Sequence, residues 1–170
     1  MLEKMKMIWQ DAKQLKDERG LTLVELLVVV VILGIIAAIA VVAIGGIIEN
    51  SRKDAMVADA KQMVSSSKIY AASNPVAKGE SVKLMFTGTP STAANTTPKE
   101  VSGKEFIDKL QDPFTNATYT NAFVVVTNTA GKYSYTVTLD SGTKNSYKYA
   151  ATPEGDLTRT ELEKEESATN

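Results

Sequence analysis

The chain contains no cysteine and no histidine among its 170 residues. Without cysteine there is no disulfide framework and no thiolate nucleophile, and without histidine the commonest metal ligand and general base is missing. The formal net charge of −1 argues against a nucleic-acid surface that works by phosphate neutralisation. These absences predict a protein that is not an enzyme, with no catalytic residue, metal site or cofactor and no confident nucleic-acid site.

Proline is absent from Leu21 to Asn74, and charged side chains are absent from Leu26 to Ile48. At 1.5 Å per residue, an apolar helix from Leu26 to Ile48 spans roughly 35 Å, enough to cross a bilayer core of about 30 Å. The sequence therefore predicts one long helix whose first half spans a membrane. Asn74-Pro75 is expected to end it.

One acid interrupts the start of this apolar run. Glu25 follows Arg19-Gly20-Leu21-Thr22-Leu23-Val24. An unpaired charge costs about 2.5–3.5 kcal/mol at the centre of a membrane helix, and less near an end. An ordinary membrane anchor has no use for this acid, so a partner for Glu25 is implied.

The run from Gly20 to Glu25 resembles the class III signal of type IV prepilins and pseudopilins: glycine, an apolar residue, Thr, two apolar residues and Glu. The resemblance implies that a prepilin peptidase cuts after Gly20 and methylates the new N-terminus at Leu21, with Thr22 and Glu25 serving recognition or assembly. Two positions depart from the common pattern. Leu21 stands where Phe or Met is commoner, and Val42 where many relatives have proline.

A free amine at Leu21 supplies a candidate partner for Glu25. Such an amine has a pKa near 8 and is mostly cationic at neutral pH. If it meets Glu25 of a neighbouring subunit, each charge offsets the other's desolvation and the axial step between subunits is fixed. Pairing within one subunit is the alternative.

Five segments are expected. They are a cytoplasmic leader (1–20), a transmembrane and assembly helix (21–48), its amphipathic continuation (49–74), an extracytoplasmic head (75–153) and an acidic tail (154–170). Basic residues in the leader outnumber those just beyond the helix, so the N-terminus is predicted to stay cytoplasmic. The leader is either a disposable tail, the preferred interpretation, or an amphipathic helix on the membrane. A conventional signal peptide cut near Ala37 to Ala43 is the alternative to a cut after Gly20.

The helix continuation carries an apolar stripe. Met56, Ala60, Met63, Ser67 and Tyr70 recur at steps of four and three, which predicts one face packed on the head. Gly45-Gly46 is either a weak point in the helix or a place of close helix packing.

The head is predicted to be a small antiparallel sheet, which makes the fold class α+β, a pilin fold. Expected elements are a strand at 82–86, a surface loop at 90–98, a helix at 104–110 started by Ser102, and strands at 123–127, 132–140 and 146–150. Asn128-Thr129-Ala130-Gly131 is a hairpin signal. The tail is expected to fray or to form one short helix. Asp112-Pro113-Phe114 favours a turn over a calcium site.

These features predict a structural subunit of a type IV pilus or pilus-like filament. Alternatives are a pseudopilin of a type II secretion system or competence pilus, and a single-pass anchored binding domain. Expected partners are the prepilin peptidase, copies of the chain and other pilins, membrane lipid and, indirectly, an assembly platform protein and its ATPase. The expected location is the cytoplasmic membrane before assembly and a cell-surface filament afterwards.

Overall fold

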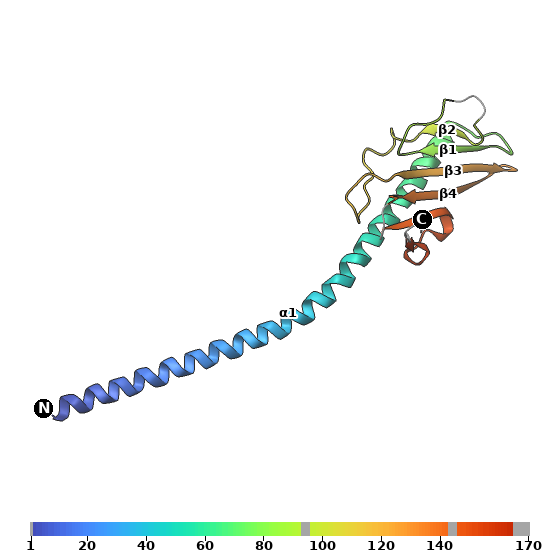
Figure 1. Ribbon diagram of the computed structural model, residues 1–170. Helices are drawn as coiled ribbons and strands as arrows, with labels where there is room; N and C mark the ends of the chain where they lie inside the picture. The colour runs from blue at the N-terminus through green and yellow to red at the C-terminus, as the bar shows by residue number, and fades with distance from the viewer. Residues whose placement is uncertain (1, 93–95, 143–145, 165–170) are drawn as a thin grey trace, which may run out of the picture. The chain divides into compact units, whose positions relative to one another are not determined.

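The computed structural model describes residues 2–92, 96–142 and 146–164, with side chains described at all of these except 2, 11–22 and 164. The chain divides into two compact units, Met1–Ile48 and Glu49–Asn170. One α-helix, α1 (Leu2–Ser73), runs through the first unit and continues into the second (Figure 1). It ends beside Asn74-Pro75 as predicted, but it begins far earlier than Leu21.

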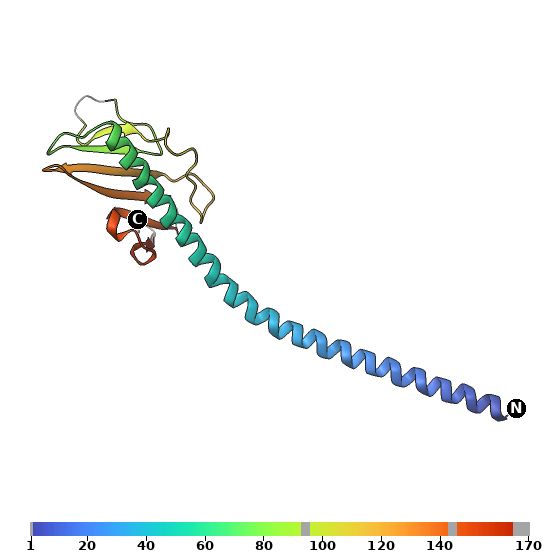
Figure 2. The ribbon, with the colours of Figure 1, turned by 180° about the vertical axis from the view of Figure 1, so that it is seen from behind.

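A single sheet forms the second unit together with the last turns of α1. Its strand order is β2-β1-β3-β4-β5-β6. The strands are β1 (Ser81–Met85), β2 (Lys99–Ser102), β3 (Asn121–Thr129), β4 (Lys132–Asp140), β5 (Tyr147–Pro153) and β6 (Glu163–Lys164). The end of α1 lies across one face of this sheet (Figure 2). The predicted α+β class, a long N-terminal helix packed on a small and mainly antiparallel sheet, is confirmed.

The hairpin between β3 and β4 follows the sequence signal. Thr129 pairs with Lys132, leaving a two-residue loop in which Ala130 and Gly131 have φ of 55° and 92°. Positive φ at both loop positions is the geometry whose twist matches that of the two strands. The Gly131 N–H also donates to Asn128 Oδ1 at 2.8 Å.

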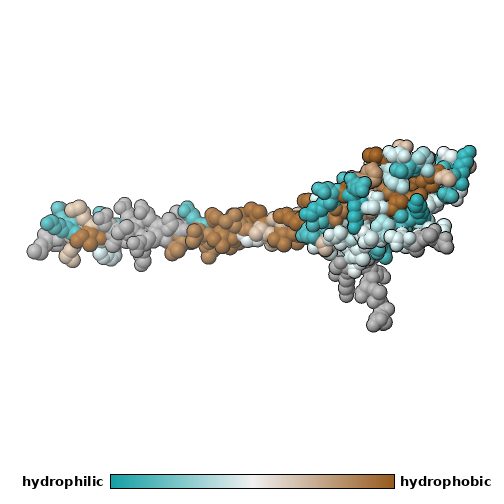
Figure 3. All heavy atoms as spheres, turned by 90° about the horizontal axis from the view of Figure 1, so that it is seen from above, coloured by the Kyte–Doolittle hydropathy of each residue, from teal (hydrophilic) through white to brown (hydrophobic). Residues whose placement is uncertain are grey.

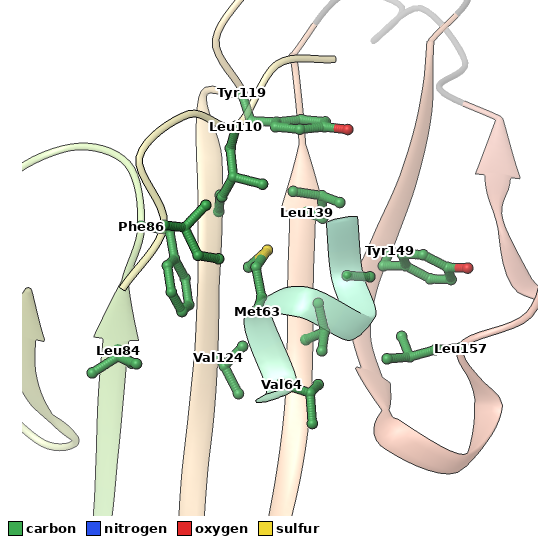
Figure 4. Packing of buried hydrophobic residues seen from close by; sticks show 14 of the residues in the cluster. Met63, Val64, Leu84, Phe86, Leu110, Tyr119, Val124, Leu139, Tyr149 and Leu157 are labelled. Carbon is green, nitrogen blue, oxygen red and sulfur yellow. The ribbon is translucent and has the colours of Figure 1, made fainter. Parts of the chain in front are cut away.

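The core lies between the polar half of α1 and the inner face of the sheet. Met56, Ala60, Met63 and Ser67 are fully buried, and Tyr70 is partly buried against the same cluster, which confirms the predicted stripe. Figure 4 shows Met63 and Val64 of α1 among side chains from β1, β3, β4 and β5. Partners from the sheet and the C-terminal segment include Leu84, Val124, Leu139, Tyr149 and Leu157.

The prediction of a helix at 104–110 is wrong. These residues form turns and irregular structure, with Ile107 and Leu110 buried in the core. The chain instead forms β2 just before them, and β2 pairs with β1 in parallel, unlike the other strand pairs of the sheet. At Gly103 the backbone that leaves β2 passes close to the Phe86 ring: a Cβ at this position would lie 2.9 Å from that ring.

The tail prediction is wrong for residues 154–164. They form two 3-10 turns, η1 (Glu154–Asp156) and η2 (Arg159–Glu161), followed by β6. Leu157 and Leu162 are buried in the core. Arg159 donates to Asp54 of α1 from Nε at 2.8 Å and from Nη2 at 2.7 Å. The rest of the predicted tail lies outside the described residues.

Candidate processing and assembly segment

The predicted site residues all lie on α1, in the first unit. Gly20, Leu21 and Thr22 are within the helix, although their side chains are outside those described. The Glu25 side chain is exposed, two residues into the apolar run. Positions 21 and 25 are one turn apart on the same face of the helix, about 6 Å along its axis. Both pairing schemes for Glu25, within one subunit and between subunits, therefore stay open.

The apolar run itself is uncovered within its unit. Every residue from 23 to 48 is exposed except Ala40, and the exposed fraction of the large apolar side chains runs from 47% at Val28 to 80% at Val42. Figure 3 shows this stretch as hydrophobic surface. The helix segment Leu23–Ser73 contains a window long and apolar enough to cross a membrane. A surface of this kind needs lipid or other protein around it.

Among the described residues, no side chain packs against the glycines of this run. A Cβ at Gly34, Gly45 or Gly46 would meet no atom within 4 Å, and α1 remains helical through all three positions. Their small size is therefore available to a contact outside the chain, where small residues allow helices to approach closely. Each still weakens the helix by about 1 kcal/mol relative to alanine.

Just beyond the apolar run, α1 meets a cluster of charged and aromatic side chains in the second unit. The Tyr147 hydroxyl donates to Glu49 Oε1 at 2.6 Å, and Lys53 Nζ lies 3.0 Å from the same oxygen and 4.2 Å from the centre of the Tyr147 ring. The interactions with Tyr147 and Glu49 raise the pKa of Lys53. Sequence reasoning missed this cluster because Tyr147 follows Glu49 by 98 residues.

Asp112 organises the loop before β3. The residue is fully buried, and its carboxylate accepts hydrogen bonds from the Phe114 N–H at 2.9 Å, the Thr115 hydroxyl at 2.9 Å and the Ser146 hydroxyl at 3.0 Å. Its backbone also closes the loop, since Asn116 N–H donates to Asp112 O. The predicted turn role is confirmed, and the link to Ser146 adds a tether that the local sequence did not reveal.

In the part of the chain that the structure describes, no three acidic side chains gather closely enough to hold an ion. The Asp140 carboxylate accepts a hydrogen bond from the Gly142 N–H at 2.6 Å and so caps a turn. The first unit is thus the segment with a distinctive chemistry, one acid in an exposed apolar helix.

Residues 15–41 match the family described as the prokaryotic N-terminal methylation motif. The matched range contains Gly20, Leu21, Thr22 and Glu25 together with the first part of the apolar run. No curated protein and no solved structure matches the chain.

Proposed function

We propose, starting from the N-terminal methylation motif of a type IV pilin-like or pseudopilin precursor, that this chain is a structural subunit of a type IV pilus or pilus-like filament. The motif implies processing by a prepilin peptidase and polymerisation with other pilins. It belongs to structural subunits and carries no catalytic group. The single observation that supports the proposal best is an exposed apolar helix that begins with one acid and stands in a separate unit from the packed head.

In this proposal each site residue has a defined task. The peptidase cuts between Gly20 and Leu21, so the charged segment is removed while the apolar helix is kept. Leu21 then carries the methylated amine. Thr22 and Glu25 serve recognition by the peptidase or contact between subunits. Before assembly the helix spans the cytoplasmic membrane with its N-terminus inside. After assembly it contacts other subunits within the filament.

Glu25 supplies the counter-charge for the amine of the next subunit. Both groups leave water when subunits join, and removing one partner of a buried pair costs roughly 3–5 kcal/mol. The pairing therefore sets the axial step and disfavours other registers. The core side chains of the head are already packed against α1, so the uncovered apolar run of the first unit is the surface that this step uses.

The experiment compares Glu25→Val, Glu25→Asp and wild type for filaments recovered by shearing, with processing checked on the same samples. Glu25→Val is expected to insert and be cleaved but to assemble poorly, and Glu25→Asp to be intermediate because its side chain is shorter. Glu18→Gln is the matched control, since position 18 leaves with the leader. Abundant filaments made of Glu25→Val subunits alone would contradict the role of Glu25 as a counter-charge.

A pseudopilin of a secretion or competence system would give the same processing result but a short filament that stays within the cell envelope. A single-pass anchored binding domain would give neither a cut after Gly20 nor a filament. Recovery of the chain in sheared, extended surface filaments separates the proposed subunit from both.

A further inference from the structure

We propose that the leader, residues 1–20, binds as a helix to an anionic phospholipid surface through one face that combines its apolar and basic residues. The proposal rests on the proposed function, which places the leader beside the membrane before cleavage. It adds a ligand for a segment that the filament itself does not retain.

The backbone of the leader supports this reading. Because α1 begins at Leu2, the leader is helical, and each residue turns the chain by about 100°. At that spacing six apolar positions fall within an arc of about 140°. They are Leu2, Met5, Ile8, Trp9, Ala12 and Leu15.

The charges of the leader are separated in the same way. All five basic positions lie on or beside the apolar arc, and all four acids lie on the opposite side of the helix. The basic residues are Lys4, Lys6, Lys13, Lys16 and Arg19, and the acids are Glu3, Asp11, Asp17 and Glu18. Five bases less four acids leave a leader charge of only +1. Because the net charge is so small, a polyanion that contacts all sides of the leader helix would attract it only weakly. An anionic surface that contacts only the basic face meets the cations without the acids.

The described side chains of the leader are open to such a surface. Met5, Ile8 and Trp9 are exposed to 70%, 69% and 73% of their full area. Bulky apolar and indole side chains at this position enter the headgroup and upper acyl region, while the flanking lysines extend their stems and keep their charges at the phosphates. Anionic lipid attracts each such cation by about 1 kcal/mol, and the attraction falls off within a Debye length. Charge complementarity therefore favours lipid as the occupant over a protein groove.

This binding mode changes the direction of the chain near the cut. A leader in the plane of the membrane and a helix that crosses it need a bend between them. Gly20 is the residue of lowest helix propensity at that junction, about 1 kcal/mol worse than alanine. The bend would open the helical turn around the Gly20–Leu21 bond, whose carbonyl and amide are otherwise held in helix hydrogen bonds.

Trp9 makes the test direct, since it is the only tryptophan in the chain. The full-length chain is reconstituted in vesicles of phosphatidylcholine alone or mixed with phosphatidylglycerol. With phosphatidylglycerol, the Trp9 emission is expected to shift to the blue and to be quenched by lipids brominated on the acyl chains. Lys4→Gln/Lys6→Gln/Lys13→Gln should lose this response, because three cations contribute on the order of a hundredfold to the surface equilibrium.

The matched control removes three charges from the other side of the helix: Glu3→Gln/Asp11→Asn/Asp17→Asn should keep or strengthen the response. A second pair tests the apolar face, where Ile8→Gln should weaken insertion and Met7→Gln, off that face, should not. Equal emission in the two kinds of vesicle, or equal loss in the two triple variants, would overturn the proposal. Blue-shifted emission that the brominated lipids do not quench would overturn it too, since protein would then cover Trp9. Filament assembly uses the chain after the leader has been removed. A negative result for lipid binding by the leader would therefore leave the proposed filament function unaffected.

Discussion

The Tyr119 hydroxyl, on the loop before β3, donates a hydrogen bond of 3.1 Å to the Asp59 carboxylate on α1. Tyr119 is buried and Asp59 half-buried, so the bond ties the helix to the loop at the edge of the core. Burial is the main cause that raises the pKa of Asp59, the bond from Tyr119 works against it, and the nearby Asp112 carboxylate adds to it. The contact belongs wholly to the second unit, as do the core contacts around it.

That unit is predicted to fold alone. A chain of residues 49–170 keeps the whole buried cluster and the Glu49 contacts to Tyr147 and Lys53, and it lacks the exposed apolar run. It should be a soluble monomer with a cooperative thermal transition, as measured by light scattering and circular dichroism. If this chain forms filaments by itself, the driving contacts lie in the head and the assignment of assembly to the helix is wrong.

Asp59→Asn in this chain should raise stability at neutral pH, because it removes a charge that the native state desolvates while keeping an acceptor for Tyr119. The raised pKa means that the native state holds the proton more tightly than the unfolded chain. Wild type therefore recovers this stability as the pH falls below the folded pKa toward about 4. Urea titrations at pH 7, 5 and 4 should show the gain shrinking with acidity. A gain that stays constant across that range would contradict the cause given for the shift.

Tyr149 is predicted to affect stability at the alkaline end of the pH range. Burial, with a smaller effect of Glu161, raises the pKa of its hydroxyl to about 12, and the hydroxyl donates to Thr158 O at 2.7 Å. The stability from its neutral form is complete below pH 10 and is lost as the pH rises through about 12. Tyr149→Phe should lose less stability than wild type between pH 9 and 11 on a common denaturant scale. Identical alkaline losses would show that Tyr149 is not the group responsible.

Two substitutions in the C-terminal segment should differ strongly. Leu157→Ala empties a site that is 2% exposed and should cost about 2–4 kcal/mol of unfolding free energy. Arg159→Ala removes a pair with Asp54 in which both side chains are about half exposed, and should cost less than about 1 kcal/mol. Urea midpoints of the two variants measure the difference. Equal costs would mean that the segment is held by its charges and not by its core contacts.

Asp112→Asn should cost about 1.5–3 kcal/mol, because the buried carboxylate accepts three hydrogen bonds that are stronger while it is charged. Asp108→Asn is the control, since Asp108 is exposed on the same connection. Thermal unfolding of both variants provides the measurement. If both variants unfold with the wild type, the carboxylate of Asp112 is dispensable and the loop is held by its backbone alone.

The sequence predicted those parts of the fold that depend on local pattern. The helix stripe from Met56 to Tyr70 has a clear period, and the strand at 132–140 alternates between apolar and polar residues. Hairpin residues Asn128 to Gly131 carry their own turn chemistry. In each case the signal lies within a few residues of the element it describes.

The errors arose where structure depends on distant contacts. β2 is four residues long and has no alternating pattern, and its pairing with β1 replaces the helix expected nearby. Leu157 and Leu162 are isolated apolar residues in an acidic stretch, so composition hid their burial. The buried tether from Ser146 to Asp112 joins residues 34 apart and leaves no local trace.

The mass of the N-terminal peptide of the mature protein, taken from membranes and sheared filaments, tests the central claim most directly. The account predicts that this peptide begins at Leu21 with a methylated amine and that Gly20→Arg leaves the full-length precursor in the membrane. An N-terminus at Met1, a cut near Ala37 to Ala43, or normal processing of Gly20→Arg would contradict it.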